Sequence, residues 1–340
     1  HADLSYVFSA AKEIACHLDS YTVVVTKSTV PVGTGRKVQE IIRAARPDAD
    51  FDVASNPEFL REGSAIEDFR RPDRVVVGCV GERAREIMRE IYRPLFINET
   101  PILFTGRESA ELIKYASNAF LATKITFINE IARLCAHTGA DAKEVSLGLK
   151  SEPRIGMKAY LGPGGPFAGG TLARDVVTLS KLAEANGEKI SVIPAIKLSN
   201  DLHRGWAFRR LKSHLGDLRG KKIAVLGLTY TTNTDTLRRS AAVELCQKLL
   251  AADAKVSAFD PAVKNLPKEL GKISLANEIG SALENADAAV ICTEWPQFRQ
   301  ADWPKMVSLM RGKIFVDANR FLEKELKNIG GVEHLSVGRA

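Results

Sequence analysis

The 340-residue chain is long enough for two or three domains, and its composition, 45% hydrophobic and 26% charged, is that of an ordinary globular protein. No apolar run reaches the roughly 20 residues that span a bilayer, and the N-terminal HADLSYVFSAAKEIA reads as an amphipathic helix rather than a signal peptide. These features exclude a membrane protein and predict a cytoplasmic one. The basic residues behind the formal charge of +7 are scattered, so we expect small phosphorylated ligands rather than nucleic acid.

The five cysteines form no CxxC pair, and each lies in an apolar segment. They are therefore predicted to be buried free thiols. The six histidines show no metal-ligand spacing, so we expect no metal site.

Residues 1–106 alternate strand and helix patterns with short links, which predicts a parallel sheet covered by helices. A dinucleotide-binding fold opens with a strand and a GxGxxG turn, and the chain contains no such turn. Because residue 1 already reads as helical, we expect the sequence to begin inside this domain. The predicted strands are 21–27, 51–55, 74–80 and 101–104, with helices from Thr34 to about Ala45 and over 83–92.

Residues 107–215 read as a helical domain, which a glycine-rich segment at 162–170 interrupts. Its first helix, 108–137, has apolar residues at helical spacing on more than one side, so we expect it to be buried on several faces. Leu112, Ala116, Phe120, Phe127, Ile131 and Leu134 form one apolar row, and Leu121 and Ile125 lie on the other side. Further helices are predicted at Ala142–Leu149, Leu172–Ala185 and Ile193–Leu215.

Residues 216–340 return to alternating strands and helices, which predicts a second doubly wound domain. The fold class is therefore α/β, with two Rossmann-like domains flanking a helical central domain. The predicted strands are 222–228, 255–260, 287–293 and 313–318.

Three segments carry candidate chemistry. STVPVGT (28–34) places hydroxyls between a strand and a helix with Thr34 as its expected N-cap, a position suited to phosphate or simply to a capped turn. In SNPEFLREGSAIEDF (55–69), Glu58 and Glu62 share a face if the segment is helical. They could act on a catalytic water or form a solvated acidic face near Arg61.

Lys114 and Asn118 are four residues apart on the long apolar helix. A buried ammonium needs a partner, whereas a lysine near a helix end can extend to solvent. The helix is apolar enough to favour a functional lysine.

These segments occur in an order that resembles the UDP-glucose/GDP-mannose dehydrogenase family over nearly the whole chain. The other motifs that carry the resemblance are PRIG (153–156), the glycine-rich stretch before Arg174-Asp175, VLGLTY with NTD and Arg238 (225–238), FDP (259–261) and DAAVICTEWPQF (287–298).

The resemblance implies an NAD-dependent oxidation of the primary alcohol of a UDP-sugar, UDP-glucose first, to the carboxylate in two hydride transfers. It implies a dimer formed through the long central helix and a role in polysaccharide biosynthesis. It places Thr29 near the nicotinamide, Glu62 and Arg238 on the cofactor, Lys114 and Asn118 on the developing oxyanion, and Asp175 in the acid-base network. Glu58 would orient water. The expected substrate-binding residues are Glu58, Phe59, Leu60, Lys114, Asn118, Arg154, Phe167, Gly169, Gly170, Tyr230 and Arg320.

The sequence departs from the family at the nucleophile. Aligned on Asp175, the family's catalytic cysteine falls on Thr171 and its lysine on Arg174. A threonine hydroxyl is a far weaker nucleophile than a thiolate unless a dedicated base serves it. Thr231 and Asn319 stand where the family has a lysine and an arginine, although Arg320 is adjacent.

These departures leave three functions open. The first is full oxidation of the sugar, and the second is a dehydrogenase that halts at the aldehyde. The third is a non-catalytic homologue that binds a nucleotide-sugar as a regulatory or scaffold subunit.

Overall fold

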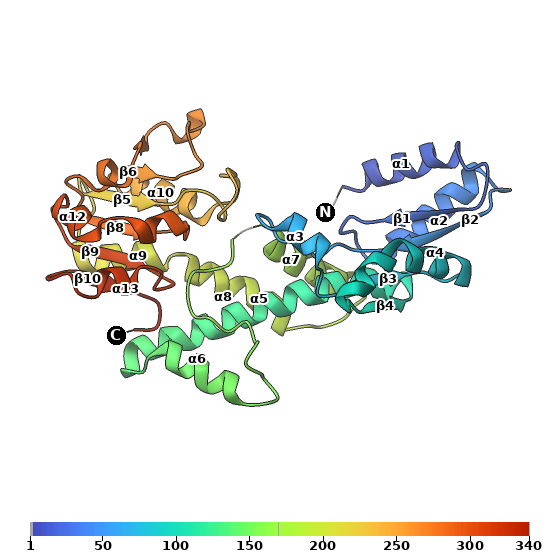
Figure 1. Ribbon diagram of the computed structural model, residues 1–340, viewed down its shortest axis with the longest axis horizontal. Helices are drawn as coiled ribbons and strands as arrows, with labels where there is room; N and C mark the ends of the chain where they lie inside the picture. Colours follow the sequence, from blue (N-terminus) through green and yellow to red (C-terminus); the bar gives the residue numbers. More distant parts are fainter. Residues whose placement is uncertain (1–2, 169, 340) are drawn as a thin grey trace. The chain divides into compact units, whose positions relative to one another are not determined.

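The computed structural model describes residues 3–168 and 170–339 and contains two compact units, the first ending at Asn118 and the second beginning at Ala119. Both units are α/β, which confirms the predicted fold class (Figure 1). The first unit contains α1 (Ser5–Ala15), β1 (Thr22–Thr26), α2 (Thr34–Ala45), β2 (Phe51–Ser55), α3 (Ala65–Arg70), β3 (Val75–Gly78), α4 (Glu82–Tyr92), the 3-10 helix η1 (Arg93–Asn98), β4 (Ile102–Thr105) and the start of α5 (Arg107–Thr138).

The first sheet has the order β1-β2-β3-β4. The outer pairs, β1 with β2 and β3 with β4, are parallel as predicted. The inner strands meet at one antiparallel pair, Ser55 with Gly78, which differs from the expected all-parallel sheet. The link between these strands holds only the six-residue helix α3, whereas parallel neighbours are usually joined by a longer crossover helix.

Alternating side chains of β1 and β2 cover the two faces of this sheet. Val24 and Val53 pack with α1 and α2, whereas Val23, Val25 and Ala54 pack toward the cluster of α4. The period of two in a strand produces this division. Both faces are apolar, as a sheet covered on both sides requires.

The second unit begins with helices and ends with a sheet. The predicted helix 193–215 is two helices, which Gly205 separates. Glycine is among the poorest helix formers, which accounts for the break at this position. The helices after α5 are α6 (Ala142–Ser151), α7 (Thr171–Ala185), α8 (Val192–Arg204) and α9 (Trp206–Leu215).

The second sheet has six strands, all parallel, in the order β10-β9-β8-β5-β6-β7. The sequence patterns predicted the four inner strands and missed the two edge strands, which have only two and three residues. The elements are β5 (Lys222–Leu226), α10 (Ala241–Ala251), β6 (Lys255–Phe259), η2 (Lys268–Leu270), β7 (Ser274–Leu275), α11 (Ile279–Leu283), β8 (Ala288–Ile291), η3 (Pro296–Gln300), α12 (Trp303–Ser308), β9 (Ile314–Asp317), α13 (Glu323–Leu326) and β10 (Glu333–Leu335).

The core of the second unit continues from this sheet into the helices. On one face, Ile223 and Val225 share a cluster with α10 and with Trp206 and Ala132 of the helical part. On the other face, Leu226 packs with α11, η3 and α12. The helical part is thus anchored to the sheet through common apolar burial.

One side of α5 differs from the prediction. The apolar row that was expected to be buried leaves Phe120, Phe127 and Leu134 exposed, with 62%, 46% and 62% of their surfaces accessible. No described helix is long and apolar enough to cross a membrane. In the part of the chain that the structure describes, these three side chains remain in contact with solvent.

The cysteine prediction holds for three residues. Cys79, Cys135 and Cys246 are buried free thiols, and Cys292 is half-buried. Cys16 is exposed, so the prediction was wrong there. It is the C-cap residue of α1.

Candidate functional site

A polar cluster lies at the carboxyl ends of β1 and β2. The ammonium of Lys27 donates to Oδ1 of Asn56 and to the hydroxyl of Tyr92, each at 3.1 Å. Asn56 is buried and donates from Nδ2 to the carbonyl of Val76 at 2.7 Å. A cavity of about 350 Å³ opens beside this cluster, at the sheet edge where open α/β folds bind ligands.

Lys114 of α5 is buried next to this cavity, with 5% of its surface exposed. Its Nζ lies 3.8 Å from Oε1 of Glu58, which lines the cavity, and 5.0 Å from the ring centroid of Phe59. The guanidinium of Arg74 covers the same ring at 4.0 Å. The apolar helix predicted a buried lysine with a partner rather than a lysine extended to solvent, and the structure has Lys114 buried beside a carboxylate.

Glu58 and Glu62 do not share a helix face. Glu58 lies in an extended segment and its Oε2 accepts from the amide of Leu60 at 2.6 Å, whereas Glu62 is exposed in a turn. Helix α3 begins only at Ala65. Pro57 disfavours a helical conformation for the residue before it, and Gly63 has a positive φ of 87°. The condition for a shared face, a helical segment, is therefore not met at these two residues.

The N-terminus of α2 also differs from the prediction. The N-cap is Gly33, with φ 91°, and Thr34 is the first helical residue. The carboxylate of Glu111 accepts from the amides of Gly33 and Gly35, so a protein carboxylate occupies the place considered for phosphate. Thr29 is half-buried in the loop before this turn, and Asn118 is half-buried on α5.

A second cavity, of about 920 Å³, lies in the second unit at the carboxyl ends of β5, β8 and β9. The chain runs outward from β5 through β6 to β7 and then returns to β8 on the other side of β5, so the cavity lies at the topological switch point. The residues that line it after these strands are Thr229, Tyr230, Thr231, Cys292, Thr293, Glu294, Ala318 and Asn319, and residues 162–168 cover it from the helical part.

The N-terminus of α10 points at this cavity. Ser240 caps the helix by accepting from the amides of Ala242 and Val243, and residues 240–242 are part of the lining. Lys143, Lys150 and Arg204 add positive charge to the lining. A helix N-terminus with nearby cations favours a phosphate ligand.

His203 is a buried histidine in the lining of the same cavity. Its Nε2 lies 2.7 Å from the carbonyl of Gly164 and its Nδ1 lies 3.5 Å from Nη1 of Arg133. The neutral ring with a proton on Nε2 satisfies both contacts. Burial lowers the pKa of His203 to about 4.

The glycine-rich segment leads into α7, where Gly170 is the N-cap and Thr171 the first helical residue. Thr171 is exposed, and no described residue hydrogen-bonds to its hydroxyl. Asp175, one turn later, is fully buried and lies 3.1 Å from Nε of Arg174. The predicted site residue Gly169 lies outside the described residues.

Three other residues that were expected to contact ligand are Gly170, Tyr230 and Phe167. A β-carbon at Gly170 would lie 3.4 Å from the hydroxyl of Tyr230, so ring and glycine are neighbours. The backbone of Phe167 is fixed by the side-chain amide of Asn200, which accepts at 3.0 Å and donates at 2.8 Å.

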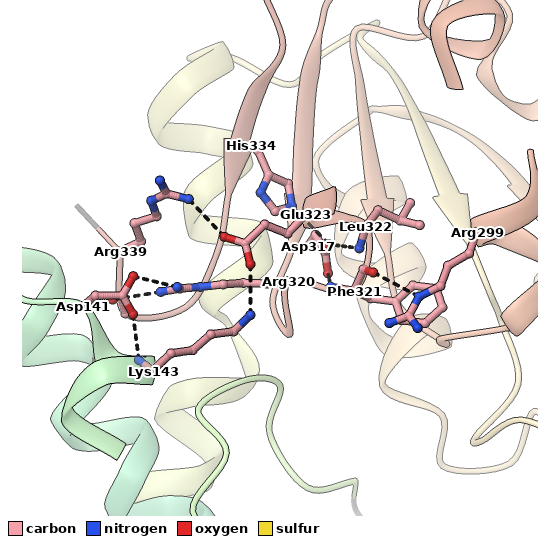
Figure 2. A network of polar contacts seen from close by, with 11 residues as sticks. Asp141, Lys143, Arg299, Asp317, Arg320, Phe321, Leu322, Glu323, His334 and Arg339 are labelled. Carbon is pink, nitrogen blue, oxygen red and sulfur yellow. Dashed lines mark hydrogen bonds and ion pairs between the residues drawn. The ribbon is translucent and has the colours of Figure 1, made fainter. Parts of the chain in front are cut away.

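Arg320 belongs to an internal network (Figure 2). It is buried, its Nη1 lies 2.6 Å from Oδ2 of Asp141, and its Nη2 donates to the carbonyl of Gly338 at 3.3 Å. Lys143 and Arg339 both pair with Glu323 beside it. Burial opposes ionisation of Asp141, but the hydrogen bond from Arg320 holds its pKa below the ordinary value.

Asn319, rather than Arg320, faces the 920 Å³ cavity. Its Oδ1 accepts from the amide of Gly165 at 2.6 Å, and its Nδ2 donates to Glu294. The carboxamide therefore joins the glycine-rich segment to the ends of β8 and β9. The expectation that Arg320 compensates for the missing arginine has no support in this geometry, because its guanidinium is already used by Asp141.

Arg154 and Arg238 are exposed, and Arg154 lies 2.8 Å from Glu152. Their expected contacts to ligand stay predictions.

Two buried carboxylates were missed as site residues. One is Glu111. The other is Asp260, after β6, whose Oδ2 accepts from the amides of Leu228 and Thr229 at 2.6 and 2.9 Å and from Nε1 of Trp295 at 3.1 Å. An aspartate directly after a buried strand was the available signal for Asp260. No local pattern marks Glu111, because its partners are more than 50 residues away in the sequence.

Comparison with known proteins gives a consistent result along the chain. Three domain models of the UDP-glucose/GDP-mannose dehydrogenase family match: the NAD binding domain at residues 1–96, the central domain at 108–202 and the UDP binding domain at 224–324. A UDP-glucose 6-dehydrogenase of Rhizobium meliloti is 47% identical, over 100% of this chain and 78% of its own. A UDP-glucose 6-dehydrogenase of Bacillus subtilis is 40% identical, over 99% and 73%. The solved structure of a UDP-glucose dehydrogenase from Pyrobaculum islandicum is 35% identical, with a TM-score of 0.88 over 99% of this chain and 76% of that one.

The buried imidazole makes stability depend on pH. Because the pKa of His203 is about 4 in the fold and near 6.5 when unfolded, both states are neutral above pH 6.5. As the pH falls from 6.5 to about 4, only the unfolded chain gains the proton, so the second unit loses up to about 3 kcal/mol of stability. We expect His203→Gln to reduce this loss.

The three tryptophans, Trp206, Trp295 and Trp303, all lie in the second unit, so their fluorescence during urea unfolding measures this effect. His17→Gln, at an exposed position, is the control. Equal pH dependence of the unfolding midpoint in His203→Gln and the wild type would contradict the assignment.

Proposed function

Because the chain belongs to the UDP-glucose/GDP-mannose dehydrogenase family, we propose that it oxidises the primary alcohol of a UDP-sugar with NAD. UDP-glucose, with UDP-glucuronate as the product of full oxidation, is the first candidate, since the named relatives are UDP-glucose 6-dehydrogenases. The observation that carries the proposal is the buried Lys114 ammonium 3.8 Å from Glu58 at a ligand-binding sheet edge.

In the first oxidation the alcohol loses a hydride to NAD and a proton to a base, and an aldehyde forms. The Lys114 ammonium stabilises negative charge as it develops on the sugar oxygen, and a fixed charge in a dry site does this without reorganisation. Glu58 holds a water that can take the proton. Asn118, one turn after Lys114, provides an amide donor to the same oxygen.

The chain offers a place for each ligand. Thr29, half-buried after β1, fits the nicotinamide end of NAD, which supplies the hydride acceptor when bound, and Glu62 and Arg238 complete the proposed cofactor contacts. The 920 Å³ cavity is the proposed place of the UDP-sugar, with the diphosphate at the N-terminus of α10. The proposed substrate contacts are Phe59, Leu60, Arg154, Phe167, Gly169, Gly170 and Tyr230.

The second oxidation requires the aldehyde to gain an oxygen from water, because Thr171 is a poor substitute for a thiolate. The hydrated aldehyde would then lose a second hydride, for which a second bound NAD would be the acceptor, and two protons, which gives the carboxylate. Asp175 supports the acid-base steps. We therefore propose that the enzyme completes the first oxidation readily and the second slowly.

A non-catalytic nucleotide-sugar-binding role is the second candidate. The presence of Thr171 favours it, since a threonine hydroxyl is a far weaker nucleophile than a thiolate. Binding of UDP-glucose without any NADH formation would decide for this role.

We also propose three domains, 1–106 for NAD, 107–215 for the helical centre and 216–340 for the UDP-sugar, in a cytoplasmic enzyme of polysaccharide biosynthesis. A homodimer is proposed through α5. Phe120, Phe127 and Leu134 recur every seven residues, which places them along one side of the helix, as helix pairing requires. A second copy of the chain would remove this apolar row from water.

The dimer is tested by Phe127→Asp. A charge in the middle of a paired apolar row would separate the copies, so we expect a monomer by analytical ultracentrifugation where the wild type sediments as a dimer. Leu309→Asp, an equally apolar exposed position in the second unit outside α5, is the control and should remain dimeric. A monomeric wild type would rule out the interface.

Removal of the ammonium tests the enzyme assignment. We expect Lys114→Ala to lower kcat by about 100-fold or more, since deletion of a comparable donor costs about 3–4 kcal/mol of transition-state stabilisation. Lys124→Ala removes a lysine ten residues later on the same helix, where it covers Phe120, and should leave kcat within about threefold. A kcat of Lys114→Ala equally close to the wild type would show a structural lysine.

The side chain at position 171 determines how many hydrides are released from each sugar molecule. We expect the wild type to yield close to one NADH per sugar, with a trappable aldehyde, and Thr171→Cys to approach two, because a thiolate captures the aldehyde covalently. Thr178→Cys, about two turns along α7, is the control and should behave as wild type. Two equivalents from the wild type at the rate of Thr171→Cys would show that the missing thiol is no handicap.

A further inference from the structure

We propose that Glu111 is a positioning residue that sets the geometry of the Lys114–Glu58 pair without touching substrate. This inference rests on the proposed function, because that pair is where the oxidation would occur.

Glu111 joins three separate segments. Its Oε2 accepts from the amide of Gly33 at 2.7 Å, and its Oε1 accepts from the amide of Gly35 at 2.8 Å and from the hydroxyl of Ser55 at 2.9 Å. The carboxylate is 3% exposed. Three donors within hydrogen-bond distance are what a buried charge needs in order to remain buried.

The site is shaped for this carboxylate. The first amides of α2 have no partner within the helix, and the helix dipole favours negative charge there. A β-carbon on Gly35 would lie 2.8 Å from the Ser55 hydroxyl and 3.0 Å from Oε1 of Glu111. The close approach of carboxylate to backbone therefore requires glycine at position 35.

The same contacts fix both members of the candidate pair. Lys114 follows Glu111 by three residues, so it lies about one turn further along the same side of α5. Glu58 follows Ser55 by three residues in the loop after β2. Movement of the Ser55 strand end against α5 would change the 3.8 Å separation of ammonium and carboxylate directly.

The chain offers a matched control on the same two helices. Glu108 of α5 pairs with Arg36 of α2 at 2.7 Å, but both side chains are substantially exposed. An exposed ion pair contributes little and leaves its partner hydrated when it is broken. Glu108→Gln thus makes the same substitution and removes an exposed α5–α2 contact while the buried contacts of Glu111 remain.

The experiment compares Glu111→Gln with Glu108→Gln in steady-state NADH formation from UDP-glucose across pH. We expect Glu111→Gln to lower kcat about tenfold or more, with the KM for UDP-glucose within about twofold, since misplacement of catalytic groups by about 1 Å can cost a hundredfold. The pH profile of kcat should also shift, because the spacing of two charges sets how they titrate. If part of the variant enzyme were unfolded, kcat would fall by the same factor at every pH and the pH dependence would not shift.

Hydrogen exchange supplies the readout that does not need activity. The backbone amides at positions 33 and 35 should exchange faster with solvent in Glu111→Gln and in Gly35→Ala. Their exchange rates should be unchanged in Glu108→Gln. If the wild type releases no NADH, the proposed function fails while the exchange result still reports whether Glu111 holds the loop. Exchange rates equal to wild type, or a lowered kcat with an unshifted pH profile, would overturn the positioning role.

Discussion

Buried carboxylates that accept backbone amides hold the irregular loops of this protein in place. Glu111, Asp260 and Asp317 are each nearly inaccessible, and each accepts at least three hydrogen bonds. Loops that follow strands expose amides with no partner in a sheet or helix, and such groups are costly when buried. One carboxylate satisfies several of them at once, so the loop acquires a single conformation and the side chains it carries acquire fixed places.

The three carboxylates act in different parts of the molecule. Glu111 fixes the loop after β1 and the end of β2, and Asp260 fixes the loop after β5 that lines the large cavity. Asp317 accepts from the amides of Phe321 and Leu322 and from Nε2 of His334. The turn that contains Asn319 and Arg320 lies between these contacts. Asn319 in that turn lines the cavity. Arg320, the next residue, pairs with Asp141 (Figure 2).

The large cavity and the small one have different chemical characters. The large cavity combines a helix N-terminus, cations and hydroxyls, which suits a diphosphate and a sugar. The edge of the first sheet combines a buried ammonium with a carboxylate, which suits charge that appears only during a reaction. The substitution of a thiol by the Thr171 hydroxyl affects the second of these tasks, because nucleotide binding needs no nucleophile.

The sequence by itself determined the order of the longer strands and helices, the fold class and the burial of Lys114. The spacing of hydrophobic residues and the ends of strands depend on residues that are close in the chain, so both can be predicted from the sequence. It failed where distant groups competed for the same place. Glu111, 76 residues from Gly35, fills the α2 N-terminus, and Asp141 takes the guanidinium of Arg320. Only the tertiary structure decides such contacts, because a buried polar group takes whichever partner the fold brings within about 3 Å, whatever their separation along the chain.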